Sequence, residues 1–501
     1  MQHSHAPATR TPSSAEVDWA SAAPVAVSGE TQRRGALSQV LRQDWPASLL
    51  ILLLDIVGWI AIYSAAGFVR KDAFYAAPLQ YLMVEGVQLL VLVQALYVIG
   101  GYNRHTETRS LTYTTEHFLA VICAAAISIA VVYSAATFDS SMRPSRSVLL
   151  ISFVVFAPLS LAYRRLVRRF AAAATANRAF LVIGSGDLAA EFYRAYRDSP
   201  NNQRLEFVAV EHSRIGEHVH GPDSPIIEGD VATKLKQLGD NYSGVIVAER
   251  VDQVRPELLQ QLVRTQFHNT RVYTLESFYE AHWKHVPVQS LDPFWPLQMG
   301  FQLAGISLYH YLKRLFDVIF ASVAFLLCLP LMAVLTLLVW WRDGRPALFR
   351  QTRVGRERQL FTIYKFRTMT ACDPATPGDM YTRAQDPRIT GLGHWLRKLR
   401  LDELPQLWNV LRGDMSLIGP RAEWVRCAEQ YEQTIPFYHF RHLVKPGITG
   451  WAQVNYPYGE SEEDAIEKLK YDLYYIRHYS VKLDAMIVLK TIHTMLFGGG
   501  R

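Results

Sequence analysis

The most chemically specific part of the sequence is a pair of adjacent carboxylates, Asp402 and Glu403, which follows a basic stretch that ends at Arg400. Nearby positive charge keeps carboxylates ionised and also attracts a phosphate group. Acidic residues also favour the first turn of a helix, where Pro405 is equally at home. The residue types alone therefore leave a reactive pair and a helix end as alternatives.

Further cations surround this pair in segments that turns would fix in place. On a strand, Lys365 and Arg367 of the run Tyr364–Met369 would point to the same side, and two aligned cations suit a diphosphate. A solvated strand face has the same pattern. Arg388 and Arg421 each lie in a turn-forming segment rich in Asp, Gly or Pro. The pattern indicates an anionic substrate.

Apolar stretches before this region predict a membrane protein. Four of them have roughly the length that a bilayer requires of a helix: 46–68, 79–100, 117–137 and 147–163. Arg residues precede the first stretch and follow the second and the fourth, which predicts that these ends face the cytoplasm. Asp55 and Glu85 fall inside spans, where a charge must be paired or neutral. We predict packing or register roles for them, since no further charges line a transport path.

A fifth apolar stretch, Leu315–Trp341, is basic at both ends. If both ends stay on the cytoplasmic side, the segment enters the membrane and returns, and Pro330 near its middle supplies the break. We predict a kinked, re-entrant helix. The alternative is an ordinary fifth span, which would place residues 342–501 outside the cell.

Residues 178–280 alternate short apolar runs with helical patterns, which predicts a small doubly wound α/β domain. Gly184, Gly186 and Ala189 match a GxGxxG/A loop, in which backbone amides approach a phosphate. The same small residues suit any tight turn between a strand and a helix. We therefore favour a structural or regulatory domain over a nucleotide site.

Composition agrees with a membrane protein that handles anionic substrates. Of 501 residues, 50% are hydrophobic and 19% are charged. The net charge of +7 comes without the dense basic arms of a nucleic-acid-binding protein. The four cysteines show no metal-binding or disulfide spacing. Residues 1–45 are typical of a disordered tail.

The segment Tyr311–Arg501 resembles the bacterial sugar transferase family, the polyprenyl-phosphate hexose-1-phosphate transferases. The resemblance is carried by KFRTM, DPRIT, LDELPQLWNVLRGDMSLIGPR, KPGITGWAQVN and YDLYYI. The segments NYPYG and LFG are similar to a branch associated with exopolysaccharide loci of the PEP-CTERM type.

The layout resembles the large members of that family and implies a fold class. The expected parts are a cytoplasmic tail (1–45), a membrane α-helical bundle of four spans (46–170), a Rossmann-like α/β domain (178–280), a linker (281–310) and an α+β catalytic domain (311–501) with its re-entrant helix (315–341).

The resemblance also implies a reaction. Asp402 would attack the β-phosphate of a uridine diphosphate (UDP) sugar, release uridine monophosphate (UMP) and carry a phosphosugar, which undecaprenyl phosphate would then accept. Glucose-1-phosphate is the first expectation for the transferred group and galactose-1-phosphate the alternative. Asp402 and Glu403 would hold Mg²⁺. The cations expected to contact the phosphates and UDP are Lys365, Arg367, Arg388, Arg400 and Arg421.

The resemblance further implies an enzyme of the bacterial inner membrane that faces the cytoplasm, primes exopolysaccharide synthesis and forms a homodimer. Two departures concern geometry. Leu329 stands where the family commonly has Ser before the kink proline, and Ala422 stands where it usually has Pro. The acidic cluster at 460–464 is better explained by Ser461 capping a helix with Asp464 than by a second metal.

Two other functions are weaker alternatives. A membrane-bound nucleotide-sugar dehydratase needs a Tyr-xxx-Lys pair, and Tyr309 and Lys313 have that spacing. No second glycine loop precedes them, however. A scaffold that has lost turnover is disfavoured because the carboxylate pair and the cations are intact.

Overall fold

The computed structural model describes residues 45–501 apart from several short segments. The segments outside the described residues are 71–77, 104–105, 139–144, 176–177, 200–202, 211–213, 237, 239–240, 251–253, 268–269, 293, 298–307, 371–385, 457–458, 460 and 498–501. The tail predicted for residues 1–45 therefore lies outside the described residues except for its last residue.

The four apolar stretches form four helices: α2 (Trp45–Arg70), α3 (Pro78–Val98), α4 (Leu111–Ala135) and α5 (Arg146–Thr175). Among the described residues, α2, α4 and α5 are long and apolar enough to cross a bilayer, and α11 (Leu308–Asp343) is the fourth such helix. The described apolar part of α3, Val84–Val98, is shorter. Four helices that could cross a membrane indicate that the protein is associated with one.

A buried ion pair joins α2 to α5. Arg164 pairs with Asp55, and neither side chain is exposed. Tyr102 donates a 2.6 Å hydrogen bond to the same carboxylate, and Tyr163 donates another. Because a charge in an apolar helix is costly unless it is paired, these contacts fix α2 against α5. They agree with the packing role predicted for Asp55.

A parallel sheet of five strands follows in the chain, in the order β3-β2-β1-β4-β5. Its strands are β1 (Ala179–Ile183), β2 (Arg204–Ala209), β3 (Ile227–Asp230), β4 (Tyr242–Val247) and β5 (Val272–Thr274). Its helices are α6 (Asp187–Arg197), α7 (Val231–Lys236), α8 (Pro256–Phe267) and α9 (Leu275–Phe278).

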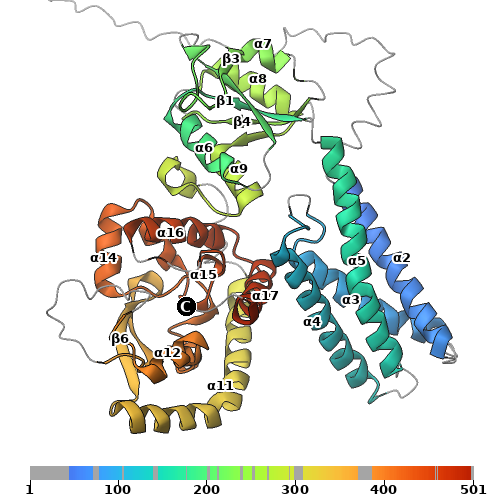
Figure 1. Cartoon of the computed structure of the whole chain (residues 1–501), viewed down its shortest axis with the longest axis vertical. Helices are drawn as coiled ribbons and strands as arrows, with labels where there is room; N and C mark the ends of the chain where they lie inside the picture. The colour runs from blue at the N-terminus through green and yellow to red at the C-terminus, as the bar shows by residue number, and fades with distance from the viewer. Residues whose placement is uncertain are drawn as a thin grey trace, which may run out of the picture. The chain divides into compact units, whose positions relative to one another are not determined.

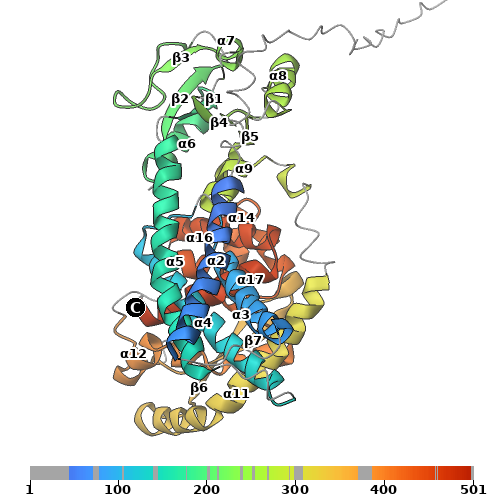
Figure 2. The same ribbon diagram turned by 90° about the vertical axis from the view of Figure 1, so that its right-hand side faces the viewer.

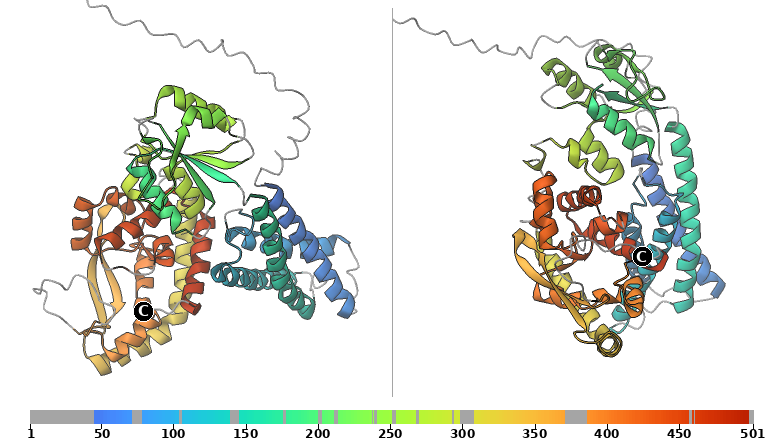
Figure 3. Two further views of the ribbon diagram at one scale, coloured as in Figure 1. Left: turned by 45° about the horizontal axis from the view of Figure 1, so that its top comes forward. Right: turned by 60° about the vertical axis from the view of Figure 1, so that its left-hand side comes forward.

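Helices cover both faces of this sheet, because successive side chains of a strand point to opposite sides. Phe180 and Val182 of β1 share a core with α6 and α9, whereas Leu181 and Ile183 share one with α7 and α8. Figure 3 shows this layered arrangement. The predicted alternation of strands and helices is therefore an α/β sheet.

Helix α11 runs for 36 residues and bends sharply, as Figure 1 shows. Pro330 lies in its interior, where the missing N–H and a clash with the preceding turn bend a helix. The two sides of Pro330 pack on different groups. Ala321, Ala324 and Phe325 lie with Ile363, Leu407 and Val410. Met332, Leu335 and Val339 lie with Phe366, Leu392 and Leu396.

After α11, the C-terminal region combines two small sheets with six α-helices among the described residues. The strands are β6 (Leu348–Val354) antiparallel to β7 (Leu360–Phe366), and β8 (Ser416–Ile418) parallel to β9 (Gly447–Thr449). The helices are α12 (Gly391–Lys398), α13 (Gln406–Arg412), α14 (Val425–Thr434), α15 (Trp451–Asn455), α16 (Glu462–Arg477) and α17 (Val481–Phe497).

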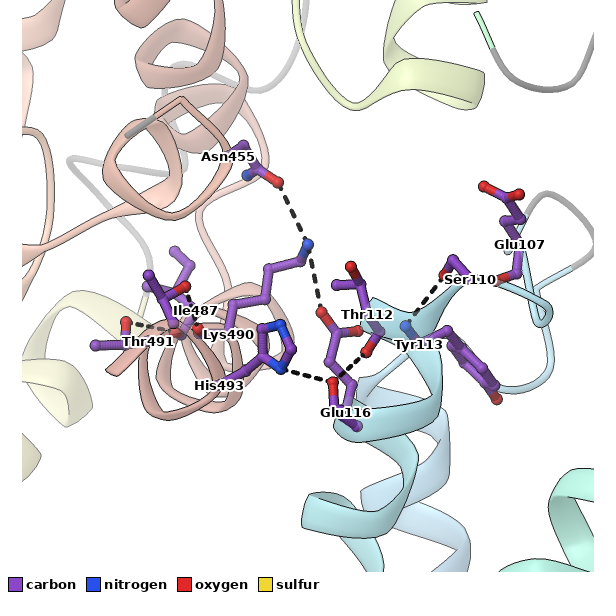
Figure 4. Close-up of polar contacts among 12 residues, drawn as sticks. Glu107, Ser110, Thr112, Tyr113, Glu116, Asn455, Ile487, Lys490, Thr491 and His493 are labelled. Carbon is purple, nitrogen blue, oxygen red and sulfur yellow. Dashed lines mark hydrogen bonds and ion pairs between the residues drawn. The ribbon is translucent and has the colours of Figure 1, made fainter. Parts of the chain in front are cut away.

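The last helix, α17, packs against α3 and α4 of the apolar helices, and Figure 2 shows these elements together. Lys490 of α17 lies 3.4 Å from Glu116 of α4 and donates a 3.3 Å hydrogen bond to Asn455 of α15. His493 and Thr115 form a second polar contact of 2.6 Å. Figure 4 shows how Lys490 reaches both partners.

Candidate active site

The two carboxylates lie in a single 3-10 turn, η8 (Leu401–Glu403), between α12 and α13. Arg400 has a left-handed backbone with φ of 57°, which is uncommon for a residue other than glycine and reverses the chain after α12. Pro405 then occupies the position before the first residue of α13. Both Asp402 and Glu403 are buried, with 9% of each residue exposed.

Glu403 is held by two cations from distant parts of the chain. Lys365 of β7 lies 2.8 Å from its Oε1, and Arg421, which follows β8, lies 3.6 Å from the same atom. Burial raises the pKa of Glu403, but Lys365 and Arg421 outweigh it and lower that pKa to about 2. Glu403 is therefore ionised at neutral pH.

Asp402 has the opposite electrostatic surroundings. Burial raises the pKa of Asp402, and the charge of Glu403 adds to that increase, although Lys365 opposes it. Its Oδ1 atom is enclosed and has no hydrogen-bond partner among the described residues. Two neighbouring carboxyls with pKa values shifted in opposite directions are typical of groups with different catalytic tasks.

Two further predicted cations, Arg367 and Arg388, bind protein groups other than the carboxylate pair. Arg367 donates to the backbone carbonyls of Asp343, Gly344 and Arg345, so it fixes the end of α11. Arg388 makes two bonds to the Asp386 carboxylate, of 2.8 and 2.6 Å. Lys365 and Arg367 thus serve different partners, although the sequence predicts that they point to one side.

All the residues predicted for the C-terminal site nevertheless line one cavity of about 2210 Å³. They are Lys365, Arg367, Arg388, Arg400, Asp402, Glu403 and Arg421. Apolar side chains of α11 and α17, such as Phe320 and Val488, line the same cavity. The volume exceeds the roughly 300–1,000 Å³ of most small-molecule sites, so the cavity has room for more than one substrate.

The sequence reasoning missed a second group of charged residues that lines this cavity. The group consists of Arg353, Glu423, Arg441, Lys468 and Asp472. Asp472 lies inside the YDLYYI motif, which was the one available signal. The others are isolated charges with no distinctive spacing, so only the tertiary structure brings them together.

The carboxylate pair fits one divalent cation bound jointly with a substrate. Among the described residues, no group of three or more His, Cys, Asp or Glu side chains could hold a metal by itself. The unpartnered Oδ1 of Asp402 and the ionised Glu403 offer the oxygen ligands that Mg²⁺ prefers, and substrate phosphates usually complete such sites. At 461–464, Ser461 and Asp464 form the predicted capping box, which is confirmed.

The glycine loop of the α/β sheet has a structural reason for its composition. Gly184 has φ of 137°, and a Cβ there would lie 2.5 Å from the Ala248 carbonyl oxygen. The backbone N–H of Ser185 donates to the Glu249 carboxylate at 3.3 Å, so a negative charge already lies at this loop. Gly186 precedes α6 and Ala189 is buried within it.

The Tyr-xxx-Lys pair has a structural partner as well. Tyr309 and Lys313 both donate to Asp484 of α17. This ion pair joins α11 to α17 and gives no support to a dehydratase site.

Known proteins resemble this chain. One family matches its C-terminal part, and one relative matches nearly two thirds of the chain. The family described as "Bacterial sugar transferase" matches residues 308–498. An uncharacterized sugar transferase of Haemophilus influenzae is 31% identical over 334 residues, which are 63% of this chain and 68% of that protein.

Two relatives are named for their reactions. A UDP-N-acetylgalactosamine-undecaprenyl-phosphate N-acetylgalactosaminephosphotransferase of Aeromonas hydrophila is 39% identical over 259 residues, 52% of this chain and 60% of that protein. A UDP-glucose:undecaprenyl-phosphate glucose-1-phosphate transferase of Escherichia coli (strain K12) is 35% identical over 284 residues, 54% of this chain and 60% of that protein. The chain thus spans about three fifths of the length of these two relatives.

Proposed function

This chain belongs to the bacterial sugar transferase family, and on that premise we propose that it transfers a hexose-1-phosphate from a UDP-hexose to undecaprenyl phosphate and releases UMP. Glucose-1-phosphate is the proposed group, with galactose-1-phosphate as the alternative. The observation that carries this proposal is the buried pair Asp402 and Glu403 in a cavity lined by cations, inside the matched region.

Asp402 is the proposed nucleophile. Its carboxylate oxygen bonds to the β-phosphorus of the UDP-hexose while the bond from that phosphorus to the UMP oxygen breaks. A phosphate oxygen of undecaprenyl phosphate then attacks the same phosphorus, breaks its bond to Asp402 and restores the carboxylate. The product is undecaprenyl diphosphate hexose. Within the described part of the chain, the Oδ1 atom has no hydrogen-bond partner, which supports this role because no such bond has to be broken first.

Glu403 and the surrounding cations prepare the site for two anionic substrates. Glu403 stays ionised between Lys365 and Arg421, and so it keeps both cations at the cavity wall. We propose that Lys365, Arg388, Arg400 and Arg421 contact substrate phosphates. Arg367 acts instead as a positioning residue, because it donates hydrogen bonds to the carbonyls that end α11.

Mg²⁺ is the proposed cofactor, held by Asp402 and Glu403 together with substrate phosphates. When bound, it supplies positive charge that lowers the repulsion between a carboxylate and a diphosphate. We expect removal of divalent cations to abolish turnover.

We also propose that the chain lies in the cytoplasmic membrane of a bacterium. The spanning helices anchor it, and α11 enters the membrane and returns at Pro330, so that residues 342–501 face the cytoplasm, where UDP-sugars are made. The α/β sheet over 178–280 is proposed to be a Rossmann-like domain with a structural role, since Glu249 lies at its glycine loop. We further propose that the chain forms a homodimer and that it primes exopolysaccharide synthesis.

The decisive variant is Asp402→Asn, which keeps the size of the side chain and removes its nucleophilic oxygen. We expect it to lower product formation by at least about 10³-fold, as loss of a nucleophile does elsewhere. Purified protein would be given UDP-glucose or UDP-galactose with undecaprenyl phosphate, and the lipid product would be identified by mass spectrometry. Wild-type rates in this variant would exclude Asp402 as the nucleophile, and Glu467→Gln on α16 is the matched control.

A further inference from the structure

Five charged side chains form a second polar region of the cavity, apart from the carboxylate pair. They are Arg353 of β6, Glu423 before α14, Arg441 of η9 (Tyr438–Leu443), and Lys468 and Asp472 of α16. Buried charges are rare unless they are paired or bind a ligand. Among the described residues, two polar atoms of this region have no hydrogen-bond partner, Arg353 Nε and Asp472 Oδ1, and the second belongs to a carboxylate.

Asp472 is 1% exposed and uses only part of its hydrogen-bonding capacity. Its Oδ2 accepts a 3.0 Å hydrogen bond from Arg441. Its Oδ1 has no hydrogen-bond partner within the described part of the chain. A buried carboxylate oxygen without a donor is costly, and burial accordingly raises the pKa of Asp472 to about 6. A ligand hydroxyl or N–H would satisfy this oxygen.

Lys468 lies one helical turn before Asp472 and so on the same face of α16. Its ammonium donates a 3.1 Å hydrogen bond to the carbonyl of Gly459. An ammonium carries three N–H donors, and that contact takes one of them. Lys468 and Asp472 together therefore present a donor and an acceptor side by side, the combination that recognises a hydroxyl group.

Arg421 connects this region to the carboxylate pair. Arg441, which holds Asp472, also donates a 3.0 Å hydrogen bond to the backbone carbonyl of Arg421. The guanidinium of Arg421 faces Glu403 at 3.6 Å. Asp472 is therefore connected through Arg441 to the residue that faces the carboxylate pair. In a UDP-hexose, the sugar is attached directly to the reacting β-phosphate, whereas the uracil ring lies farther away, at the end of the UMP group.

We propose that Asp472 and Lys468 form the subsite that recognises hexose hydroxyl groups of the donor. Asp472 Oδ1 accepts a hydrogen bond from one hydroxyl, and Lys468 donates to the oxygen of a neighbouring hydroxyl. The inference rests on the proposed function, because that function supplies the UDP-hexose. The imide edge of uracil offers similar donor and acceptor chemistry, so the experiment must separate the two groups.

The experiment measures binding, which does not depend on turnover. Full-length protein with Asp402→Asn, with and without Asp472→Asn, would be titrated calorimetrically with UDP-glucose, each monodeoxy derivative of UDP-glucose, and UMP. With Asp472 present, we expect one deoxy derivative to bind about 10- to 100-fold more weakly than UDP-glucose, the value of one charge-assisted hydrogen bond. With Asp472→Asn, whose neutral amide oxygen is a weaker acceptor, the difference between that derivative and UDP-glucose should shrink, and UMP binding should be unchanged.

Two results would overturn the inference. If Asp472→Asn weakens UDP-glucose and every deoxy derivative by one common factor, Asp472 acts only by holding Arg441 and Arg421 in place. If UMP binding falls by the same factor as UDP-glucose binding, the subsite reads uracil and not the hexose. Glu467→Gln, on the same helix, controls for changes in α16. Turnover by the wild-type protein tests the proposed function separately. A failure of the proposed function can therefore be told apart from a failure of the hexose subsite.

Discussion

Asp402 and Glu403 are neighbours in the chain, yet their surroundings shift the pKa values of the two carboxyl groups in opposite directions. Cations fix Glu403 as an anion, whereas burial raises the pKa of Asp402, and one Asp402 oxygen has no hydrogen-bond partner among the residues that the structure describes. Within one 3-10 turn, Asp402 is therefore available as a nucleophile, while Glu403 binds the cations. This difference makes a specific prediction about pH.

The acidic limb of the pH–rate profile should report Asp402. The carboxyl must be ionised to attack, so the rate falls as the pH falls through its raised pKa. Glu403→Gln removes the neighbouring like charge and leaves Lys365 to favour the Asp402 anion. We expect this variant to have a lower maximal rate and an acidic limb shifted to lower pH. An unshifted limb in kcat/KM would contradict the proposed coupling, and Glu467→Gln should match the wild type.

Lys365 makes a testable contribution to stability. The pKa of Glu403 is lowered to about 2 from 4.5. The ionised Glu403 therefore contributes to the free energy of unfolding above pH 4.5, and this contribution is lost as the pH falls toward 2. Lys365→Met removes the cation closest to Glu403 in the described structure, and breaking a buried pair costs about 3–5 kcal/mol. We expect a marked loss of thermal stability at neutral pH that Lys365→Met with Glu403→Gln largely reverses. An additive loss in the double variant would show that the pair does not interact.

Among the elements of the fold, α11 has a bend that its sequence predicts. The basic residues at both ends and Pro330 predict a bend, and the helix bends although Leu329 offers no hydroxyl to the broken backbone. Packing explains why the hydroxyl is dispensable: residues on the two sides of Pro330 are held by separate hydrophobic clusters. The sequence pattern predicted the bend but not these clusters, because their other members come from β7, α12 and α13.

The membrane path of α11 can be measured directly. In a variant without native cysteines, Leu308→Cys and Arg345→Cys would each be tested with a membrane-impermeant maleimide in inside-out and right-side-out vesicles. We expect both positions to react from the cytoplasmic side alone, because a re-entrant helix returns to the side from which it enters. Labelling from opposite sides would establish an ordinary span. Adding Pro330→Ala should reduce turnover by weakening the bend.

Across the whole molecule, the sequence predicts the features that depend on residues close together in the chain. The capping box at Ser461, the helical apolar stretches and the strand–helix alternation are local patterns, and each one is present. The carbonyl contacts of Arg367 and the buried charges around Asp472 arise from residues far apart in the chain. No spacing rule encodes such pairs, so the sequence assigned Arg367 to substrate and passed over Asp472.

The contact between α4 and α17 leads to a prediction about how the membrane helices support the catalytic region. Lys490 links Glu116, which is buried at 6% exposure, to Asn455 in the KPGITGWAQVN segment that borders the cavity. Lys490→Met leaves the Glu116 carboxylate without this cation, and such a loss costs about 3 kcal/mol or more. We therefore expect Lys490→Met to lower both thermal stability and turnover, since α15 loses this hydrogen bond to α17.

The matched double variant separates the electrostatic link from packing. Glu116→Gln removes the stranded charge, so Lys490→Met with Glu116→Gln should recover most of the lost stability measured by thermal unfolding in detergent. Turnover should recover only partly, because the hydrogen bond from Lys490 to Asn455 is still absent. Equal recovery of both quantities would mean that the membrane helices stabilise the protein without positioning the cavity wall. Unequal recovery would identify α17 as the element through which they do so.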